Sequence, residues 1–204
     1  IYTGEDTLSL HDALPISKAN PGVASSTTHG MANGTIGYFS DTTEGMNELA
    51  GAAFAVANQA TSTFELQAEN TTSYGTFTSG TFTPVLTWST LSTATSYSIG
   101  DAAADQIDTT TLLDRLKQSE IGLLASQTVT IEGFSDPQSA AALRIRNAAL
   151  SVSYVVVRIT LSNGERRIFR GMPSLPGESM SVGQKATGSL TFAVKGKVGM
   201  LVSA

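Results

Sequence analysis

One segment, Ser153–Gly171, places the strongest constraint on what this chain can fold into, because its pattern is that of a β-hairpin. A run rich in valine and isoleucine leads to Asn163-Gly164, and a second run containing apolar residues follows. Asn-Gly between two such runs is the strongest short-range hairpin signal, because both central residues of a type I′ turn need a positive φ. The pattern therefore predicts a sheet built around two antiparallel strands, with Asn163 and Gly164 as their turn.

A two-residue turn at these positions fixes which residues face one another across the hairpin. Ile159 is expected opposite Ile168, and Arg158 opposite Phe169. Side chains alternate between the two faces of a strand, so one face of the first strand is expected to be wholly apolar. That face carries Val155, Val157, Ile159 and Leu161.

The beginning of the chain differs in kind from the rest. Residues 1–17 resemble the translation of a short-read sequencing adapter, most clearly at Thr7–Ile16, which is TLSLHDALPI. Such segments are excluded from reasoning about the fold. The polar stretch Lys18–Gly30 is interpreted as translated upstream sequence, with a natural start at Met31. The alternative is a genuine amphipathic start capped by a serine or an aspartate.

Composition limits the chemistry that is available. Charged residues make up only 14% of the chain, against about 25% in ordinary soluble domains, which favours a surface covered by other molecules, including neighbouring copies. The chain has no cysteine, and its only histidines, His11 and His29, precede Met31. Cysteine- and histidine-based zinc sites and the Ser-His-Asp and Cys-His nucleophile systems are therefore excluded after Met31. Neither a membrane span nor a signal peptide is indicated by the sequence.

Acidic and basic residues are unevenly distributed along the chain. Met31–Asp114 contains nine carboxylates and no lysine or arginine, whereas the chain from Arg115 onward contains eleven bases and five acids. Opposite patches can set the register of head-to-tail self-association. Equally, the two halves can neutralise each other within one monomer. DNA binding by a basic patch is disfavoured, because the net charge is −5 and the bases are not interleaved with aromatic residues.

The remaining pattern predicts a mainly β protein, an antiparallel β-sandwich or barrel-like domain with one flanking α-helix at about residues 137–150. Asp136 is expected to cap this helix, and Pro137 to occupy its first position. Strands are predicted at 82–91, 127–134 and 185–198, and 97–100 is expected to extend the pairing. Thr35–Phe39 is interpreted as either a strand or an arm that packs elsewhere. The pieces 63–67 and 74–77 are β-like, in a region that best fits a flexible or partner-dependent loop. The expected division is a non-native stretch at 1–30, an N-terminal arm or loop region at 31–80 and a β-sandwich core at 81–204.

Two further segments carry helical spacing. Apolar residues recur at helical intervals over Glu44–Thr61, which predicts a helix there. Leu112–Leu124 is interpreted either as a short helix capped by Asp108 or Thr109, or as an extended loop.

Three carboxylates, Asp101, Asp105 and Asp108, are spaced in a way that raises the question of a calcium or glycosidase site. A helix–loop–helix calcium loop needs glycine at its sixth position and glutamate at its twelfth, and neither is found here. A glycosidase needs a fold that places two carboxylates across a cleft, which the sequence does not show. We therefore expect no catalytic, cofactor-binding or metal-binding residue, and no enzyme.

The order of elements resembles that of the major tail tube proteins of long-tailed bacteriophages. The matching pieces are a strand with Trp88, the segment Ile107–Thr110, a strand at Thr128–Gly133, a helix beginning near Gln138, the hairpin Val157–Gly171 and a last strand at Gly188–Val198. Their shared order carries the resemblance, and Met31–Gly80 is unmatched.

This resemblance implies a subunit that self-assembles into hexameric rings, which stack into the hollow tube of the phage tail. Sheets of neighbouring copies would join edge to edge, and a negative lumen would let DNA pass without binding. The implied partners are further copies of itself and the tape-measure, tail-tip and terminator proteins, with no membrane. The implied location is the virion, after synthesis in the host cytoplasm. Asp101, Asp105 and Asp108 are expected to face the lumen or a subunit contact, and an ordinary solvated face is an equal alternative.

The alternative function is that of another virion or surface β-sandwich: a tail terminator, a decoration protein or a carbohydrate-binding module. A sugar-binding module usually presents exposed aromatic residues on one face. This chain has one tryptophan, and aromatic residues make up 7% of it.

Overall fold

The computed structural model describes residues 2–4, 15–26, 29–113 and 115–202. Its described part is mainly β, with antiparallel pairing throughout, and contains one α-helix, α1 (Ala140–Leu150). The main sheet has eight strands in the order β7-β1-β12-β13-β15-β11-β8, with β14 paired to β15. Their bounds are β1 Tyr2–Gly4, β7 Trp88–Thr90, β8 Ala94–Ile99, β11 Thr128–Phe134, β12 Val155–Thr160, β13 Arg166–Pro173, β14 Gly177–Ser179 and β15 Thr187–Leu201.

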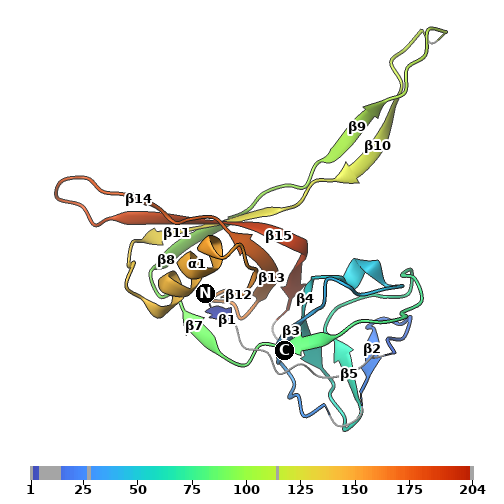
Figure 1. Ribbon diagram of the computed structural model, residues 1–204, viewed down its shortest axis with the longest axis horizontal. Coiled ribbons are helices and arrows are strands. Elements are labelled where there is room, and N and C mark those ends of the chain that lie inside the picture. Colours follow the sequence, from blue (N-terminus) through green and yellow to red (C-terminus); the bar gives the residue numbers. More distant parts are fainter. Residues whose placement is uncertain (1, 5–14, 27–28, 114, 203–204) are drawn as a thin grey trace.

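Two smaller sheets complete the fold (Figure 1). A five-stranded sheet has the order β2-β5-β4-β3-β6, and a two-stranded sheet pairs β10 with β9. Their bounds are β2 Val23–Ser25, β3 Ile36–Phe39, β4 Ala53–Ala57, β5 Thr63–Leu66, β6 Phe82–Pro84, β9 Ala104–Asp108 and β10 Ser119–Leu124, and a 3-10 turn, η1, lies at Asn47–Leu49.

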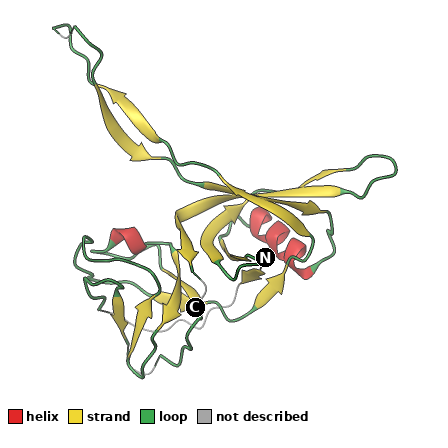
Figure 2. Ribbon diagram, turned by 180° about the vertical axis from the view of Figure 1, so that it is seen from behind, coloured by secondary structure: helices red, strands yellow, loops and turns green. Residues whose placement is uncertain are grey.

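The main sheet lies between α1 and the five-stranded sheet, as the two opposite views show (Figure 2). On one face, Val155 and Val157 of β12 pack with Ile145 of α1. On the other, Val156 of β12 packs with Ile36 of β3. Both faces of the central strand are therefore buried, and the expected β-sandwich with one flanking helix is confirmed.

The predicted apolar face of the first hairpin strand is confirmed, but the predicted turn and register are wrong. The loop has three residues: the Gly164 N–H donates to the carbonyl of Leu161 at 3.0 Å, and Leu161 N–H donates to Glu165 at 2.9 Å. Of the predicted pair, only Gly164 has a positive φ, +84°. Asn163 instead accepts a bond from the Glu165 N–H through its side chain. This is the type I turn with a glycine bulge that three-residue hairpins favour.

The longer loop shifts the pairing by one residue. Arg158 faces Ile168, and Ile159 faces Arg167. The physical reason is burial: in this register Phe169 faces Val157 and joins it on the side of α1. The predicted register would have placed Phe169 opposite a charged residue and divided the apolar set between the two faces.

The predicted helix start is also wrong by three residues. Ser139 is the cap, and its hydroxyl accepts a hydrogen bond from the Ala142 N–H. Asp136 and Pro137 belong to a preceding turn, in which the Ser139 N–H donates to the Asp136 carbonyl at 3.2 Å. Proline suits the second position of such a turn as well as it suits a helix start, so the same residues fit both structures.

The helix predicted over Glu44–Thr61 is wrong. Only the short η1 forms there, and β4 follows it with Phe54 buried on one face and Ala55 on the other. A strand buried on both faces is a continuous apolar run, which periodicity alone does not separate from a helix. The β-like piece at 74–77 forms no strand in the described structure, which agrees with the loop interpretation of that segment, and the strand predicted at 82–91 is two strands, β6 and β7, in different sheets.

The strands predicted at 127–134 and 185–198 and the pairing expected at 97–100 are confirmed as β11, β15 and β8. Of the two interpretations of 35–39 the strand is correct, and it is β3. The β-like piece at 63–67 is β5, in a five-stranded sheet rather than a flexible loop. The start of the chain takes part in the fold. β1 lies between β7 and β12, and His29 is buried, with its Nε2 3.2 Å from the carbonyl of Thr63. Most of the adapter-like segment, residues 5–14, lies outside the described residues, and the assignment of 1–30 as non-native stays a prediction.

Two polar clusters join the five-stranded sheet and its loops to the main sheet. In the first, Arg170 of β13 pairs with Asp41 and lies 4.5 Å from the ring of Tyr38. In the second, the buried carboxylate of Glu69 accepts from both Lys197 of β15 and the Tyr74 hydroxyl. These bonds tie the loop that follows β5 to the last strand. Among the described residues no helix is long and apolar enough to cross a bilayer.

Both donors in the second cluster have raised pKa values. Burial, with the hydrogen bond to Glu69, raises the pKa of Tyr74 above its ordinary value of 10.0. Burial lowers the pKa of Lys197, but the hydrogen bonds to Glu69 and Tyr74 outweigh it and raise the pKa above 10.5. Stability from both groups is fully present below these ordinary values and is lost as the pH rises through the raised ones.

We predict that Gly164→Ala lowers the free energy of unfolding by about 1 kcal/mol, because alanine strongly resists the left-handed conformation of the turn. Urea unfolding followed by circular dichroism measures this. Gly100→Ala is the matched control, since Gly100 lacks a positive φ and an added Cβ would meet nothing closer than 3.4 Å. An equal loss in both variants would contradict the role given to the turn.

We predict that Glu69→Gln lowers the free energy of unfolding by about 1–3 kcal/mol at neutral pH, because it weakens a buried charge-assisted network. It should also flatten the loss of stability above about pH 10, since Tyr74 and Lys197 lose the partner that raises their pKa values. Thermal unfolding from pH 7 to 11 tests both effects. The exposed Glu48→Gln is the control and should change neither, and a Glu69→Gln profile parallel to that of the wild type would refute the coupling.

Candidate assembly surfaces

The most prominent feature outside the core is an arm, here defined as residues 101–127, that carries the hairpin β9–β10. Figure 1 shows it projecting from the main sheet well beyond the rest of the molecule. Its strands pair only with each other, from Ala104 opposite Leu124 to Asp108 opposite Ser119. At about 3.3 Å per residue, the limb from 101 to 111 is about 35 Å long.

The arm is covered with exposed apolar side chains. Seven of its large hydrophobic residues have relative exposures of 55% to 105%: Ile107, Leu112, Leu113, Leu116, Ile121, Leu123 and Leu124. Leaving one such side chain in water instead of burying it forgoes about 1.5–3 kcal/mol. Large exposed apolar patches on a soluble protein mark surfaces that other molecules cover.

The helix considered for Leu112–Leu124 is wrong, and the extended alternative is closer to the structure. The Thr109 N–H donates to the Gln118 carbonyl at 3.1 Å, and the Gln118 N–H donates to the Thr110 hydroxyl at 2.9 Å. These bonds close the hairpin just before its tip. A helix here would gain little, because the arm offers no neighbouring surface on which its leucine face could pack.

The three carboxylates singled out from the sequence all belong to this arm, and all are exposed. Asp105 and Asp108 lie on β9, three residues apart, so they point to opposite faces of the strand. Hydrogen bonds from Thr110, with Lys117 3.4 Å away, lower the pKa of Asp108. The arm therefore distributes these charges along its length, and no group of three or more ligating side chains in the described structure is placed to hold a metal ion.

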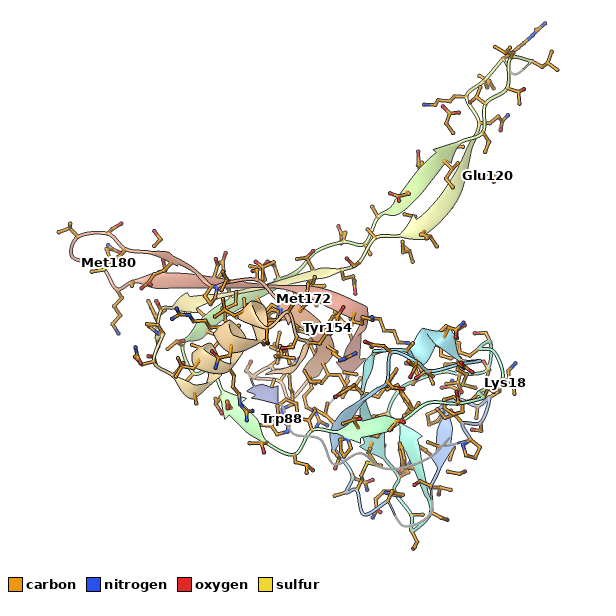
Figure 3. All side chains as sticks on the ribbon, viewed as in Figure 1. Lys18, Trp88, Glu120, Tyr154, Met172 and Met180 are labelled. Atoms are coloured by element: carbon orange, nitrogen blue, oxygen red, sulfur yellow. The ribbon has the colours of Figure 1, made fainter. Side chains whose placement is uncertain are left out.

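A second, shorter hairpin projects from the other end of the main sheet, where β14 pairs with the beginning of β15. Figure 3 labels Met180 at its outer end and Glu120 on the distant arm. Met180 and Val182 are both exposed in this hairpin, as is Leu175 just before β14. The molecule therefore presents apolar residues at two widely separated projections.

An open groove of about 330 Å³ lies between α1, β11 and the β14–β15 hairpin. Leu91, Ile131 and Leu190 form part of its lining and are buried in the core. Leu175 and Phe134 also line it and remain substantially exposed. Its charged lining residues are Glu132, Asp136, Glu178 and Arg146. Glu132 directly follows the buried Ile131 on β11, so its side chain points to the opposite face of the sheet. The groove is thus an apolar depression bordered by Asp136, Glu178 and Arg146.

The main sheet also has open edges. In the described structure β7 and β8 end the strand order, so each pairs with one neighbouring strand only. Unpaired N–H and C=O groups on an edge can accept a strand from another chain. The sheet edges, the two projecting hairpins and the groove are candidate assembly surfaces. The sequence analysis expected open sheet edges but did not predict the projecting hairpins.

The sequence feature that could have indicated the arm is its run of leucines flanked by β-branched and acidic residues. Because these leucines also have helical spacing, the same run was equally compatible with a helix.

The chain was compared with known proteins. A family model described as phage tail tube protein matches residues 44–203, which includes the arm, the helix, the central hairpin and the last strand. No curated protein matches the sequence. The family is structural rather than enzymatic, and its members lie in the tail of the virion. A match over this much of the chain shows that the protein belongs to the phage tail tube family.

Proposed function

We propose that this protein forms the tail tube by self-assembly into hexameric rings that stack around a lumen for DNA. The observation that carries the proposal is the arm, whose seven exposed large hydrophobic residues have no partner surface within the described part of the subunit. Family membership gives self-assembly into a tube as the common role. The ring symmetry and the passage of DNA rest on the resemblance to tail tube proteins and are part of the proposal.

The low content of charged residues and the open edges of the main sheet are both consistent with a subunit of a tube. A tube subunit covers much of its surface with neighbouring copies, and only 14% of this chain is charged. The edge strands β7 and β8 would be joined to neighbouring subunits rather than protected by their own side chains. Tape-measure, tail-tip and terminator proteins are the further partners expected at the inside and ends of such a tube.

The arm carboxylates Asp101, Asp105 and Asp108 are proposed to face either the lumen or a contact between subunits. All three are exposed in the single subunit. In the lumen their negative charge would repel DNA phosphates and keep the passing DNA from binding. In a contact they would meet the basic residues that the second half of the chain supplies.

The self-assembly proposal predicts that the purified full chain, concentrated and examined by negative-stain electron microscopy with sizing chromatography, forms hollow rings or tubes with six-fold end views. Seeding with preformed fragments is included, because nucleation of a ring is slower than growth. Particles that remain monomeric when concentrated and seeded, and that bind glycans on an array, would favour the carbohydrate-binding alternative.

The charge proposal predicts that replacing Asp101, Asp105 and Asp108 together by asparagine has one of two measurable effects. If the carboxylates face the lumen, assembly is unchanged but tubes retain short duplex DNA at low salt. If they face a contact, the concentration needed for assembly rises. Both readouts come from one pelleting assay with labelled DNA. Replacing the exposed Glu44 and Glu48 by glutamine is the control, because both lie outside the arm and the groove, and a triple arm variant identical to the wild type in both readouts would refute the proposal.

A further inference from the structure

The tip of the arm, here defined as residues 112–117, needs an apolar surface that its own subunit does not supply. Leu112, Leu113 and Leu116 at this tip are 78% to 105% exposed. The same segment contains the cations Arg115 and Lys117 and one acid, Asp114. Lys117 lies 3.4 Å from Asp108 on the arm itself. The tip therefore presents leucines together with the guanidinium of Arg115, which calls for an apolar seat bordered by carboxylates.

The groove beside α1 has those two properties. Its lining includes Leu91, Ile131 and Leu190, and it is open to solvent beside the exposed Leu175. Glu178 of β14 also lines the groove and is exposed. It pairs with Gly188, two residues before Leu190 on β15, so its side chain points to the same face of the sheet as Leu190. Glu132 of β11 directly follows the buried Ile131 and points to the opposite face. At the β14 end of the groove, Glu178 is thus the carboxylate that is placed to meet an incoming cation.

The tip does not reach this groove within one subunit. Figure 1 shows the arm projecting away from the main sheet on the side opposite the β14–β15 hairpin that borders the groove. A tip that fills such a groove therefore belongs to a second copy. A contact between two different surfaces of the same protein is heterologous, so an open assembly keeps a free tip at one end and a free groove at the other until it closes into a ring or continues as a stack.

We infer that the leucine-rich tip of the arm of one subunit occupies the groove between α1 and the β14–β15 hairpin of the next, with Arg115 meeting Glu178. The inference rests on the proposed tube function and names the contact through which copies join. The leucines supply the apolar burial, and the charge pair fixes the register, as electrostatic complementarity does at other interfaces.

The absence of cysteine from the chain allows a clean cross-linking test. Single variants Leu113→Cys and Leu175→Cys of the full chain are mixed, concentrated and treated with a short bismaleimide. The expected product is a covalent dimer containing one of each, identified by mass spectrometry, and the double variant should give a ladder. Leu113→Cys mixed with Met200→Cys is the matched control, because Met200 is 61% exposed and Leu175 is 59% exposed. Equal yields with both partners would overturn the inference.

Charge reversal tests the register independently. Arg115→Glu should raise the concentration needed for assembly about tenfold, and adding Glu178→Arg to the same chain should restore most of that loss. Circular dichroism and thermal unfolding should be unchanged, because both residues are exposed.

The outcomes separate the inference from the function on which it rests. Tubes that form normally with Arg115→Glu, and whose Leu113→Cys and Leu175→Cys variants do not cross-link, would overturn the tip-and-groove contact and leave the tube intact. A chain that never self-associates, alone or seeded, would overturn both. Loss of assembly with Arg115→Glu that Glu178→Arg does not repair would overturn the assigned charge pair.

Discussion

The fold depends on one constraint: the hairpin β12–β13 is apolar on both faces, so both faces must be covered. The helix α1 covers one side through Ile145, and the five-stranded sheet covers the other through Ile36. The last strand, β15, pairs within the main sheet and also contacts the five-stranded sheet. It has a bulge at Gly196, where φ is +74° and an added Cβ would lie 2.9 Å from the Ala52 side chain. The bulge lets β15 bend toward the smaller sheet, where Lys197 meets Glu69.

The largest group of exposed apolar side chains in the described subunit lies on the arm. The layers bury the apolar residues at the centre of the body, whereas seven large hydrophobic residues of the arm remain exposed to solvent. A projecting two-stranded hairpin is marginally stable in water by itself. The proposed burial of these apolar residues against another copy would explain the sequence of the arm, and the open edges β7 and β8 fit the same proposal. On that proposal, assembly continues the packing that folds the subunit.

The sequence predicted the elements that have a local physical signature. Alternation identified β11 and β15, and the hairpin was located by Asn163-Gly164, because these signals act within a few residues. Features set by tertiary context were wrong. The loop gained a residue because Phe169 has to be buried beside Val157, and β4 resembled a helix because both of its faces are covered. For Leu112–Leu124 the extended alternative came close to the structure, but the projection of the arm that also carries Asp101, Asp105 and Asp108 was not predicted, because it depends on which strands the rest of the sheet leaves unpaired.

The most direct test of the central claim, that the arm is completed by other copies, is hydrogen–deuterium exchange of the full chain measured when dilute and when assembled. The account predicts that amides of β9, β10 and the arm tip exchange rapidly in the dilute protein and become protected on assembly, together with those lining the groove beside α1. Protection on assembly that is confined to other surfaces, with the arm exchanging equally fast in both states, would contradict it.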